Sequence, residues 1–395
     1  MGKKRILFVF PDLCIGGATS AFIALLKKMQ FDNHEVDVLF LNNGEFRLSQ
    51  LPEQIRILPD AAKADLLSPT VRMKKIANFL LTGKAFTALR QSRKNRNVPF
   101  EKAFQMATNQ MLARIHSEIC DPLEEEYDLA VAYLELWPTA YVAQKVKAKK
   151  KLAWVHVDYS KIGMNPGIDA DLYAEMDQIV GVSEACAKQL CINFPQYESK
   201  ITWVENYVDA EMVHQRAKLP ITLEEEFQSY GGFRIVTVAR LTSYIKGLDR
   251  IVNISKSLKA EGFDFRWYLI GDGEDEQLLK NSIEKNSLSD TLFLLGGKDN
   301  PYPYMEQADL FVLASRNEGK PITVSEAQIL HTPVLVTRYP SAQKQMEGGN
   351  GIIVENNEDA LLDGLRDILG GSTQLHPTRY LESDQTEQLS KMGIL

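Results

Sequence analysis

Short apolar runs recur along this 395-residue chain, and amphipathic stretches separate them. Runs of this length, bounded by glycine, proline and polar clusters, predict β-strands. In the first half they cover residues 5–10, 35–41, 129–134, 152–157 and 178–182. In the second half they cover residues 233–239, 265–270, 291–295, 310–313, 333–336 and 351–354. Strands that alternate with helical patterns predict parallel sheets, and hence an α/β fold.

A polar stretch at about 210–232 interrupts this alternation and lacks strand character. We therefore predict two Rossmann-like domains, at 1–210 and 211–371, whose parallel sheets face a central cleft. Ligands of such folds bind at the carboxyl ends of the strands. The last residues, 372–395, are polar and amphipathic. Their pattern leaves open whether this tail packs back on the first domain or is disordered.

Charge and cysteine content narrow the class of protein. The net charge of −7 argues against a nucleic-acid partner. The first 210 residues carry 26 basic and 25 acidic side chains, whereas the remainder carries 19 and 27, so any anionic partner is expected on the first half. The four cysteines lack metal-ligand spacing, which favours reduced packing residues in a cytoplasmic protein. No apolar run approaches the roughly 20 residues that span a bilayer.

The most informative motif is NEGKPITVSEA at residues 317–327, in which Glu318 and Glu326 stand eight positions apart. Pro321 suits the first turn of a helix. The free N–H groups of such a helix start, around residues 320–323, would point at an anion. Both glutamates can then face a ligand whose phosphates lie on the helix start.

A second motif, VARLTSYIKG at residues 238–247, directly follows a predicted strand. Arg240 and Lys246 therefore emerge at the carboxyl edge of the sheet. Two cations at that edge can hold a diphosphate and stabilise it as a leaving group. In the first half, the run WVHVD at 154–158 ends a strand and presents His156 and Asp158 at the same kind of edge. Gly16-Gly17 lies between a strand and a helix, where the lack of a Cβ allows a close approach of the backbone.

These motifs resemble family 4 of the glycosyltransferases, whose hallmark is a Glu-x7-Glu motif in the second domain. The context ADLFVLASRNEGKP at residues 308–321 makes the resemblance specific. It implies the GT-B fold, transfer with retention at the anomeric carbon, and independence from cofactors and metal ions. It also implies that Glu318 contacts the donor sugar, that Glu326 binds the ribose, and that His156 approaches the reacting carbon.

The resemblance supplies a candidate site. The candidate catalytic residues are His156, Arg240, Lys246 and Glu318. The candidate donor-binding residues are Gly16, Gly17, Gly271, Lys298, Gly319, Lys320, Pro321, Ile322 and Glu326. Asp158 would orient His156 or contact the acceptor. The donor is expected to be a nucleoside-diphosphate sugar, with UDP favoured, and the acceptor a hydroxyl of a glycan or lipid-linked glycan of a cell-surface polysaccharide. The first domain would bind the acceptor and the second the nucleotide sugar.

Two further features bear on metals and membranes. Asp169-Ala170-Asp171 has the form of a metal-binding DxD, but it precedes an expected helix start at Leu172, where acidic residues suit the helix dipole. Residues 71–96 are basic and partly amphipathic, without any acidic residue, and the lysines at 145–151 extend the basic character. Such a segment either is solvated or rests on an anionic membrane. The chain is thus expected to be cytoplasmic, or peripheral on the inner face of the cell membrane.

Three alternatives stay open at this stage. A GT-B UDP-sugar 2-epimerase would share both domains but would need acid–base carboxylates. A non-catalytic glycosyltransferase-like partner subunit would keep the fold and lose the motifs. A dinucleotide-dependent oxidoreductase would need a glycine fingerprint that Gly16-Gly17 does not supply.

Overall fold

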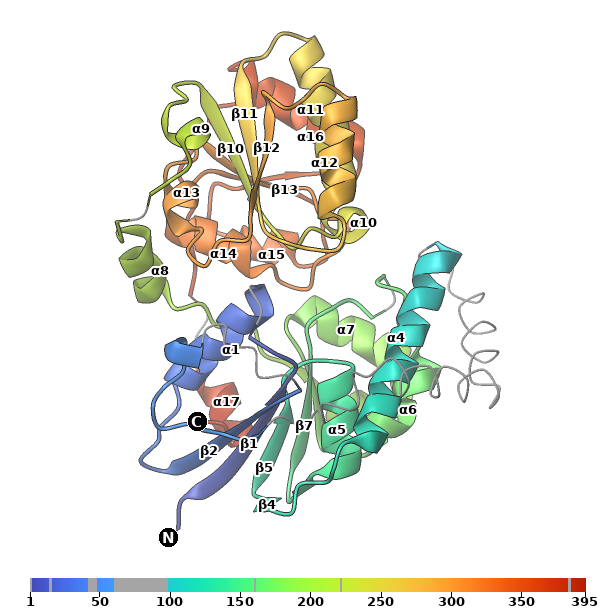
Figure 1. Ribbon diagram of the computed structural model, residues 1–395. Coiled ribbons are helices and arrows are strands. Elements are labelled where there is room, and N and C mark those ends of the chain that lie inside the picture. The colour runs from blue at the N-terminus through green and yellow to red at the C-terminus, as the bar shows by residue number, and fades with distance from the viewer. Residues whose placement is uncertain are drawn as a thin grey trace. The chain divides into compact units, whose positions relative to one another are not determined.

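The structure is a computed structural model in which the chain forms two compact α/β units (Figure 1). It describes residues 2–13, 16–41, 48–59, 99–159, 161–220, 222–382 and 385–395. The first unit comprises Met1–Cys14, Phe22–Asn206 and Asp384–Leu395, and the second comprises Ile15–Ala21 and Tyr207–Ser383. Apart from the short segment Ile15–Ala21, the chain passes into the second unit after Asn206 and returns to the first for its last residues.

The first unit is built on a seven-stranded parallel sheet in the order β3-β2-β1-β5-β7-β8-β9. Its strands are β1 (Lys4–Phe10), β2 (His34–Phe40), β3 (Arg56–Ile57), β5 (Leu129–Ala132), β7 (Lys151–Val155), β8 (Gln178–Gly181) and β9 (Ile201–Trp203). A separate short ladder pairs β4 (Glu126–Tyr127) with β6 (Lys147–Ala148). The central strand β5 is fully buried and β1 is buried from Ile6 to Phe10, as expected for a sheet with helices on both faces.

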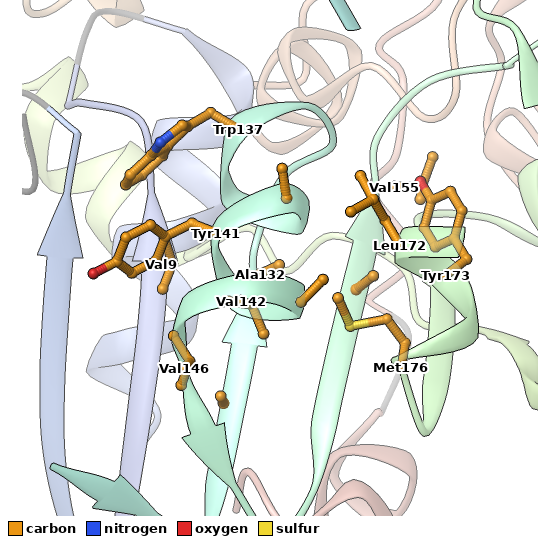
Figure 2. Close-up of a cluster of buried hydrophobic side chains, with 14 of the residues drawn as sticks. Val9, Ala132, Trp137, Tyr141, Val142, Val146, Val155, Leu172, Tyr173 and Met176 are labelled. Atoms are coloured by element: carbon orange, nitrogen blue, oxygen red, sulfur yellow. The ribbon is translucent and has the colours of Figure 1, made fainter. Parts of the chain in front are cut away.

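Helices connect these strands and close a core on the sheet. They are α1 (Gly17–Lys27), α4 (Phe100–Ile119), α5 (Trp137–Lys145), α6 (Pro166–Ala174), α7 (Glu184–Asn193) and α17 (Thr386–Met392), with 3-10 turns η1 (Leu48–Gln50) and η3 (Pro195–Lys200). Figure 2 shows Trp137, Tyr141 and Val142 of α5 packed with residues of β5, β7 and α6. This buried apolar layer makes the sheet a rigid platform for the loops at its edge.

The second unit is built on a six-stranded parallel sheet in the order β12-β11-β10-β13-β14-β15. Its strands are β10 (Phe233–Val238), β11 (Phe265–Ile270), β12 (Leu292–Gly296), β13 (Leu310–Leu313), β14 (Val334–Thr337) and β15 (Ile352–Val354). The helices are α8 (Ala210–Ala217), α9 (Glu225–Gln228), α10 (Ser243–Lys246), α11 (Leu248–Ala260), α12 (Glu276–Lys285), α13 (Tyr302–Glu306), α14 (Ile322–Ile329), α15 (Ala342–Gln345) and α16 (Glu358–Leu369).

Alternate residues of these strands enter two different cores, because successive side chains point to opposite faces of a sheet. Ile235 and Trp267 pack with α11, α12 and α16, which lie together on one side of the sheet in Figure 1. Val236 and Tyr268 pack with α13 and α14 on the other side. The sheet is therefore covered on both faces, and its carboxyl edge is left to the loops.

The long strands lie within two residues of their predicted bounds, whereas the short strands β3, β4, β6 and β9 were not predicted. The division after Asn206 lies four residues before the predicted boundary. The second unit extends to Ser383, beyond the predicted residue 371. The terminal helix α17 groups with the first unit, where the Lys4 ammonium donates to the Gly393 carbonyl at 2.7 Å. The tail therefore belongs to the second unit as far as Ser383, and only its last residues, with α17, belong to the first.

Candidate functional site

Four consecutive loops of the second unit meet at the carboxyl edge of its sheet, because the strands are parallel. They follow β10, β11, β12 and β13. These loops, with the start of α14, carry every candidate residue from Arg240 onward. They are Arg240, Lys246, Gly271, Lys298, Glu318, Gly319, Lys320, Pro321 and Ile322, and Glu326 follows within α14. The tertiary structure therefore gathers the two second-half motifs at one edge.

Lys246 and Glu318 are brought into direct contact, although 72 residues separate them in sequence. The Lys246 ammonium lies 2.7 Å from Oε1 of Glu318, and the side chains are 24% and 10% exposed. The Ser315 hydroxyl donates to the same oxygen at 2.7 Å. A carboxylate held by a cation and a hydroxyl has a fixed orientation, so this pair forms the ordered centre of the candidate site.

Two glycines allow the loops to approach so closely. Gly247 has φ of +66°, and a Cβ there would lie 2.1 Å from the Ala314 carbonyl oxygen. Gly271 has φ of +151°, and a Cβ there would lie 2.0 Å from the Ala239 carbonyl oxygen. No L side chain fits either place without displacement of backbone. The candidate Gly271 is therefore explained by packing of the loop after β11 on the loop after β10.

The start of α14 has the features of an anion site. The helix begins at Ile322, and Pro321 is its N-cap, one position before the first turn in which the sequence placed it. No side chain of the described residues caps its first N–H groups. The Ser341 hydroxyl donates to the Gly319 carbonyl at 2.5 Å, and the Gln345 amide donates to the Pro321 carbonyl at 2.9 Å. These bonds hold the loop so that the positive end of the helix is fixed.

Glu326 lies about one turn into α14 and is 4% exposed. Its Oε1 accepts a hydrogen bond of 2.9 Å from the Tyr302 hydroxyl. Arg240, by contrast, is exposed, and no carboxylate of the described residues lies within ion-pair distance of its guanidinium. Of the two cations after β10, one is therefore already paired and the other points into solvent.

Lys298 is engaged in an ion pair with Glu224, which also accepts from the Tyr304 hydroxyl. Burial would raise the pKa of Glu224, but the hydrogen bonds from Lys298 and Tyr304 outweigh it and lower that pKa. The lysine thus anchors the loop after β12 to the start of α9. If Lys298 also binds a ligand, its ammonium must interact with Glu224 and with the ligand at the same time.

Several residues that the sequence did not single out hold the loop after β13. The Asn356 amide donates to the Arg316 carbonyl at 3.0 Å, and its oxygen accepts from Arg250 at 2.7 Å. Arg316 makes two hydrogen bonds of 2.6 Å with the Asp249 carboxylate. Burial lowers the pKa of Arg250, and the neighbouring Arg316 acts in the same direction. Local sequence offers little signal for this network, because each member is an ordinary surface type.

In the first unit, His156 directly follows β7 at the carboxyl edge of that sheet. Burial lowers the pKa of its imidazole to about 3, although a hydrogen bond with the Tyr133 backbone works in the opposite direction. Its Nε2 is buried and has no hydrogen-bond partner among the described residues. His156 is thus a neutral imidazole at physiological pH, suited to accept or donate a hydrogen bond rather than to carry charge.

Two buried carboxylates belong to this edge of the sheet, and one of them contacts His156. Oε2 of Glu135, which the sequence analysis missed, accepts from the His156 backbone N–H at 3.1 Å. Burial raises the pKa of Glu135, against the effect of that bond. Asp158 is 3% exposed; its Oδ1 accepts from the Lys161 N–H at 3.3 Å, and its Oδ2 lies 3.8 Å from the Lys161 ammonium. An acid just after a buried strand was the available signal for Glu135.

The two glycines of the first loop belong, by their contacts, with the second unit. A Cβ on Gly16 would meet nothing within 4 Å, whereas one on Gly17 would lie 3.4 Å from Cβ of Ile322 in that same unit. Ile322 is the first residue of α14. Gly17 is therefore close-packed at the helix start that the candidate site uses, and Gly16 is not sterically required.

The DxD sequence lies within α6 and not before a helix, and Asp169 stands in the first turn of that helix. Helix α6 begins at Pro166, and Asn165 caps it, so the expected start at Leu172 is wrong. Asp169 is buried and accepts hydrogen bonds from Tyr159 and Gln110. Burial raises the pKa of Asp169 to about 6, although both bonds act in the opposite direction. Asp171 pairs with Arg114 instead, so the two carboxylates serve different structural contacts.

Metal and membrane features were sought in the described ranges. There, no three of the His, Cys, Asp and Glu side chains are grouped so that they could hold a metal ion. Within the same ranges, no helix is both long and apolar enough to cross a membrane. The basic segment 71–96 lies outside the described residues. Independence from metal and contact with a membrane stay predictions.

The fold is the GT-B class of α/β proteins, with two Rossmann-like domains that each contain a parallel sheet. The crystal structure of HepE from Anabaena in complex with UDP and glucose matches it with a TM-score of 0.61 at 14% identity. The match covers 93% of this chain and 90% of that one. At this identity the likeness shows the fold alone.

Sequence relationships point to one family. Residues 224–380, which include every candidate from Arg240 onward, match the family described as glycosyl transferases group 1. The chain is 28% identical over 201 residues to the N-acetylgalactosamine-N,N'-diacetylbacillosaminyl-diphospho-undecaprenol 4-alpha-N-acetylgalactosaminyltransferase of Campylobacter jejuni. It is 33% identical over 122 residues to the amylovoran biosynthesis glycosyltransferase AmsK of Erwinia amylovora. The match to the Campylobacter enzyme covers 50% of this chain and 52% of that enzyme, and the match to AmsK covers 29% and 30%. The chain therefore spans about half the length of the first relative and less than a third of the second.

Proposed function

We propose that this protein is a glycosyltransferase that moves a sugar from a nucleoside-diphosphate sugar to a hydroxyl group of a glycan or lipid-linked acceptor. The observation that carries the proposal is the Lys246–Glu318 pair, held at 2.7 Å in the same loop system as the start of α14. A diphosphate at that helix start would be met by N–H groups and by a lysine ammonium. Both stabilise negative charge that develops as the sugar–phosphate bond breaks.

The remaining candidates take complementary roles in this proposal. Arg240, which is exposed and unpaired by carboxylates of the described residues, turns to the diphosphate when the donor binds. Glu318 accepts from hydroxyls of the donor sugar, and Glu326 accepts from the ribose. The neutral imidazole of His156 approaches the reacting carbon, where a charged imidazolium would repel the oxocarbenium-like centre.

We further propose retention of configuration and independence from metal ions. In the proposed step the C1–O bond to the diphosphate breaks as the acceptor oxygen forms a bond to C1 on the same face. The acceptor proton passes to a departing phosphate oxygen, so no enzyme carboxylate is consumed as a nucleophile. The two cations and the helix start then supply the charge stabilisation that a metal ion would otherwise supply.

The names of two relatives support the acceptor class. The Campylobacter enzyme is named for transfer to a diphospho-undecaprenol glycan, and the Erwinia enzyme for amylovoran biosynthesis. The Anabaena structure contains UDP and glucose, which supports UDP as the nucleotide. We therefore propose a UDP-sugar donor and a role in assembly of a bacterial-type surface polysaccharide. Neither relative named here is an epimerase or an oxidoreductase.

One experiment tests the proposal directly. Purified protein is screened by thermal shift against UDP-, GDP- and ADP-sugars with and without EDTA, and the stabilising donor is incubated with lipid-linked or glycan acceptors. We expect one nucleotide to raise the melting temperature in EDTA, and NMR of the product to show the anomeric configuration of the donor. Isomerised donor in the absence of acceptor would instead identify an epimerase. No stabilisation by any donor would favour the non-catalytic subunit.

Residues 71–96 carry the proposed contact with a membrane surface. Each lysine or arginine near an anionic surface contributes about 1 kcal/mol at low salt. We expect the protein to co-sediment with vesicles rich in phosphatidylserine and to stay in solution with phosphatidylcholine vesicles. A variant with Arg72, Lys74 and Lys75 changed to glutamine should bind more weakly. Equal binding to both vesicle types would refute this contact.

A further inference from the structure

Tyr302 is in contact with one of the proposed donor-binding residues but is assigned no role by the motifs. It is the first residue of α13 and is 3% exposed. Its hydroxyl donates a hydrogen bond of 2.9 Å to Oε1 of Glu326, which is itself 4% exposed. Both groups are buried, so the bond is shielded from competing water. The interaction links the segment after β12 to the first turns of α14.

The ring of Tyr302 is held from the opposite side. The Arg216 guanidinium of α8 lies over it, 5.6 Å from the ring centroid. The same guanidinium donates to the Asp299 backbone oxygen at 2.6 Å and to its carboxylate at 2.7 Å. The end of α13 is also fixed, because the Thr332 hydroxyl donates to the Met305 carbonyl at 2.8 Å. The Tyr302 hydroxyl therefore occupies a defined point.

A glutamate carboxylate needs such a fixed partner to bind two neighbouring hydroxyls. The last torsion of glutamate is broad and has no sharp staggered minima, so the carboxylate plane is set by its contacts. A hydroxyl that donates to one carboxylate oxygen, as Tyr302 does to Glu326, restricts the orientation of that plane. A 2′,3′-diol can then meet the carboxylate without a further loss of side-chain freedom.

We propose that Tyr302 is a positioning residue that sets the affinity for the ribose of the donor, and its preference over 2′-deoxyribose, by orienting the Glu326 carboxylate. The inference rests on the proposed function, in which Glu326 accepts from the ribose hydroxyls. Loss of one hydrogen bond to a charged acceptor lowers affinity by about tenfold or more. The wild-type protein should therefore bind UDP at least about tenfold more tightly than 2′-deoxy-UDP.

The test compares UDP with 2′-deoxy-UDP by isothermal titration calorimetry on the full chain. In Tyr302→Phe we expect the preference for UDP to fall to roughly threefold or less, because a carboxylate that has lost this hydrogen bond is less firmly oriented and gains less from the 2′-hydroxyl. The KM for the UDP-sugar should rise by about the same factor as the dissociation constant of UDP, with kcat within roughly twofold of wild type. A residue needed only for folding would weaken both nucleotides equally and leave the preference unchanged.

Tyr268→Phe is the matched control. Tyr268 lies in β11 of the same unit, is fully buried, and donates a hydrogen bond of 2.8 Å to the Glu226 carbonyl. It loses a comparable bond that does not involve Glu326, so its preference for UDP should equal that of wild type. Should Tyr302→Phe fail to fold, Arg216→Met removes the cation over the ring, keeps the hydroxyl, and is expected to reduce the preference as well.

The outcomes separate this inference from the proposed function. If the wild-type protein binds UDP with the expected preference and both variants retain that preference, Tyr302 has no positioning role. If wild type binds UDP without any preference for the ribose, the assignment of Glu326 fails and the inference fails with it. If wild type binds no nucleoside diphosphate at all, it is the proposed function that is wrong.

Discussion

Replacement of Lys246 by methionine is the sharpest perturbation of the candidate site, because methionine keeps the length of the side chain and removes its charge. A lysine ammonium about 4 Å from a phosphate oxygen gains about 4 kcal/mol at an effective dielectric constant of about 20. Glu318, 2.7 Å from this ammonium, already neutralises part of the charge. We therefore expect a net loss of about 3 kcal/mol in the transition state, or a decrease in kcat of about 100-fold.

The same change should have a small effect on folding. Glu318 is 10% exposed and would keep only its hydrogen bond from Ser315 among the contacts described above. For a pair that is neither fully exposed nor fully buried, we expect a loss of about 2 kcal/mol in the free energy of unfolding. Circular dichroism at about 25 °C should therefore show a fully folded protein.

Turnover of the UDP-sugar, followed by release of UDP, provides the assay. Lys259→Met is the matched control, since Lys259 of α11 pairs with Asp290 at 2.5 Å within the same unit and lies outside the candidate loops. Its kcat should stay within about twofold of wild type. A folded Lys246→Met protein whose kcat is within about threefold of wild type would refute the charge-stabilisation argument.

Two further predictions concern stability. Gly247→Ala places a Cβ 2.1 Å from the Ala314 carbonyl oxygen, whereas a Cβ on Gly262, also at positive φ, meets nothing within 4 Å. Urea unfolding should show that Gly247→Ala costs at least about 2 kcal/mol more than Gly262→Ala, and equal costs would contradict the close approach. Burial raises the pKa of Asp169 to about 6, against about 4 in the unfolded chain. The stability that the protonated carboxyl group contributes to the wild-type protein should therefore be lost as pH rises from about 4 to 6. Asp169→Asn should remove this contribution of about 3 kcal/mol. Urea unfolding at the two pH values should then show a smaller change in the free energy of unfolding than in wild type, and an unchanged pH dependence would count against this role of Asp169.

Most of the fold could be predicted from the sequence because its longer strands are largely buried. A parallel strand with helices on both faces reads as a continuous apolar run, and β10, β11 and β13 were found for that reason. The short strands β3, β4, β6 and β9 carry two or three residues each, too few for any period to register. The start of α6 was misplaced because Asn165, a good N-cap, stands before Pro166 and not before Leu172.

The candidate site divides in the same way. The sequence could place Lys246 and Glu318 after buried strands, since a strand end and a loop are local features. It could not show that Lys246 reaches Glu318 across 72 residues, or that Tyr302 reaches Glu326 across 24 residues. Such contacts depend on how helices pack on the two faces of the sheet.

By itself, then, the sequence determined two sets of alternating strands and helices and the loops in which charged residues stand. Only the tertiary structure decided which of those charges are paired, buried or free. The physical reason is that hydrophobic periodicity depends only on residues that are neighbours in sequence. The burial of a side chain, and its distance from another side chain, depend instead on how distant segments pack together. A lysine paired with a glutamate 72 residues away, a neutral histidine whose Nε2 is buried, and an aspartate with a pKa of about 6 are all consequences of that packing.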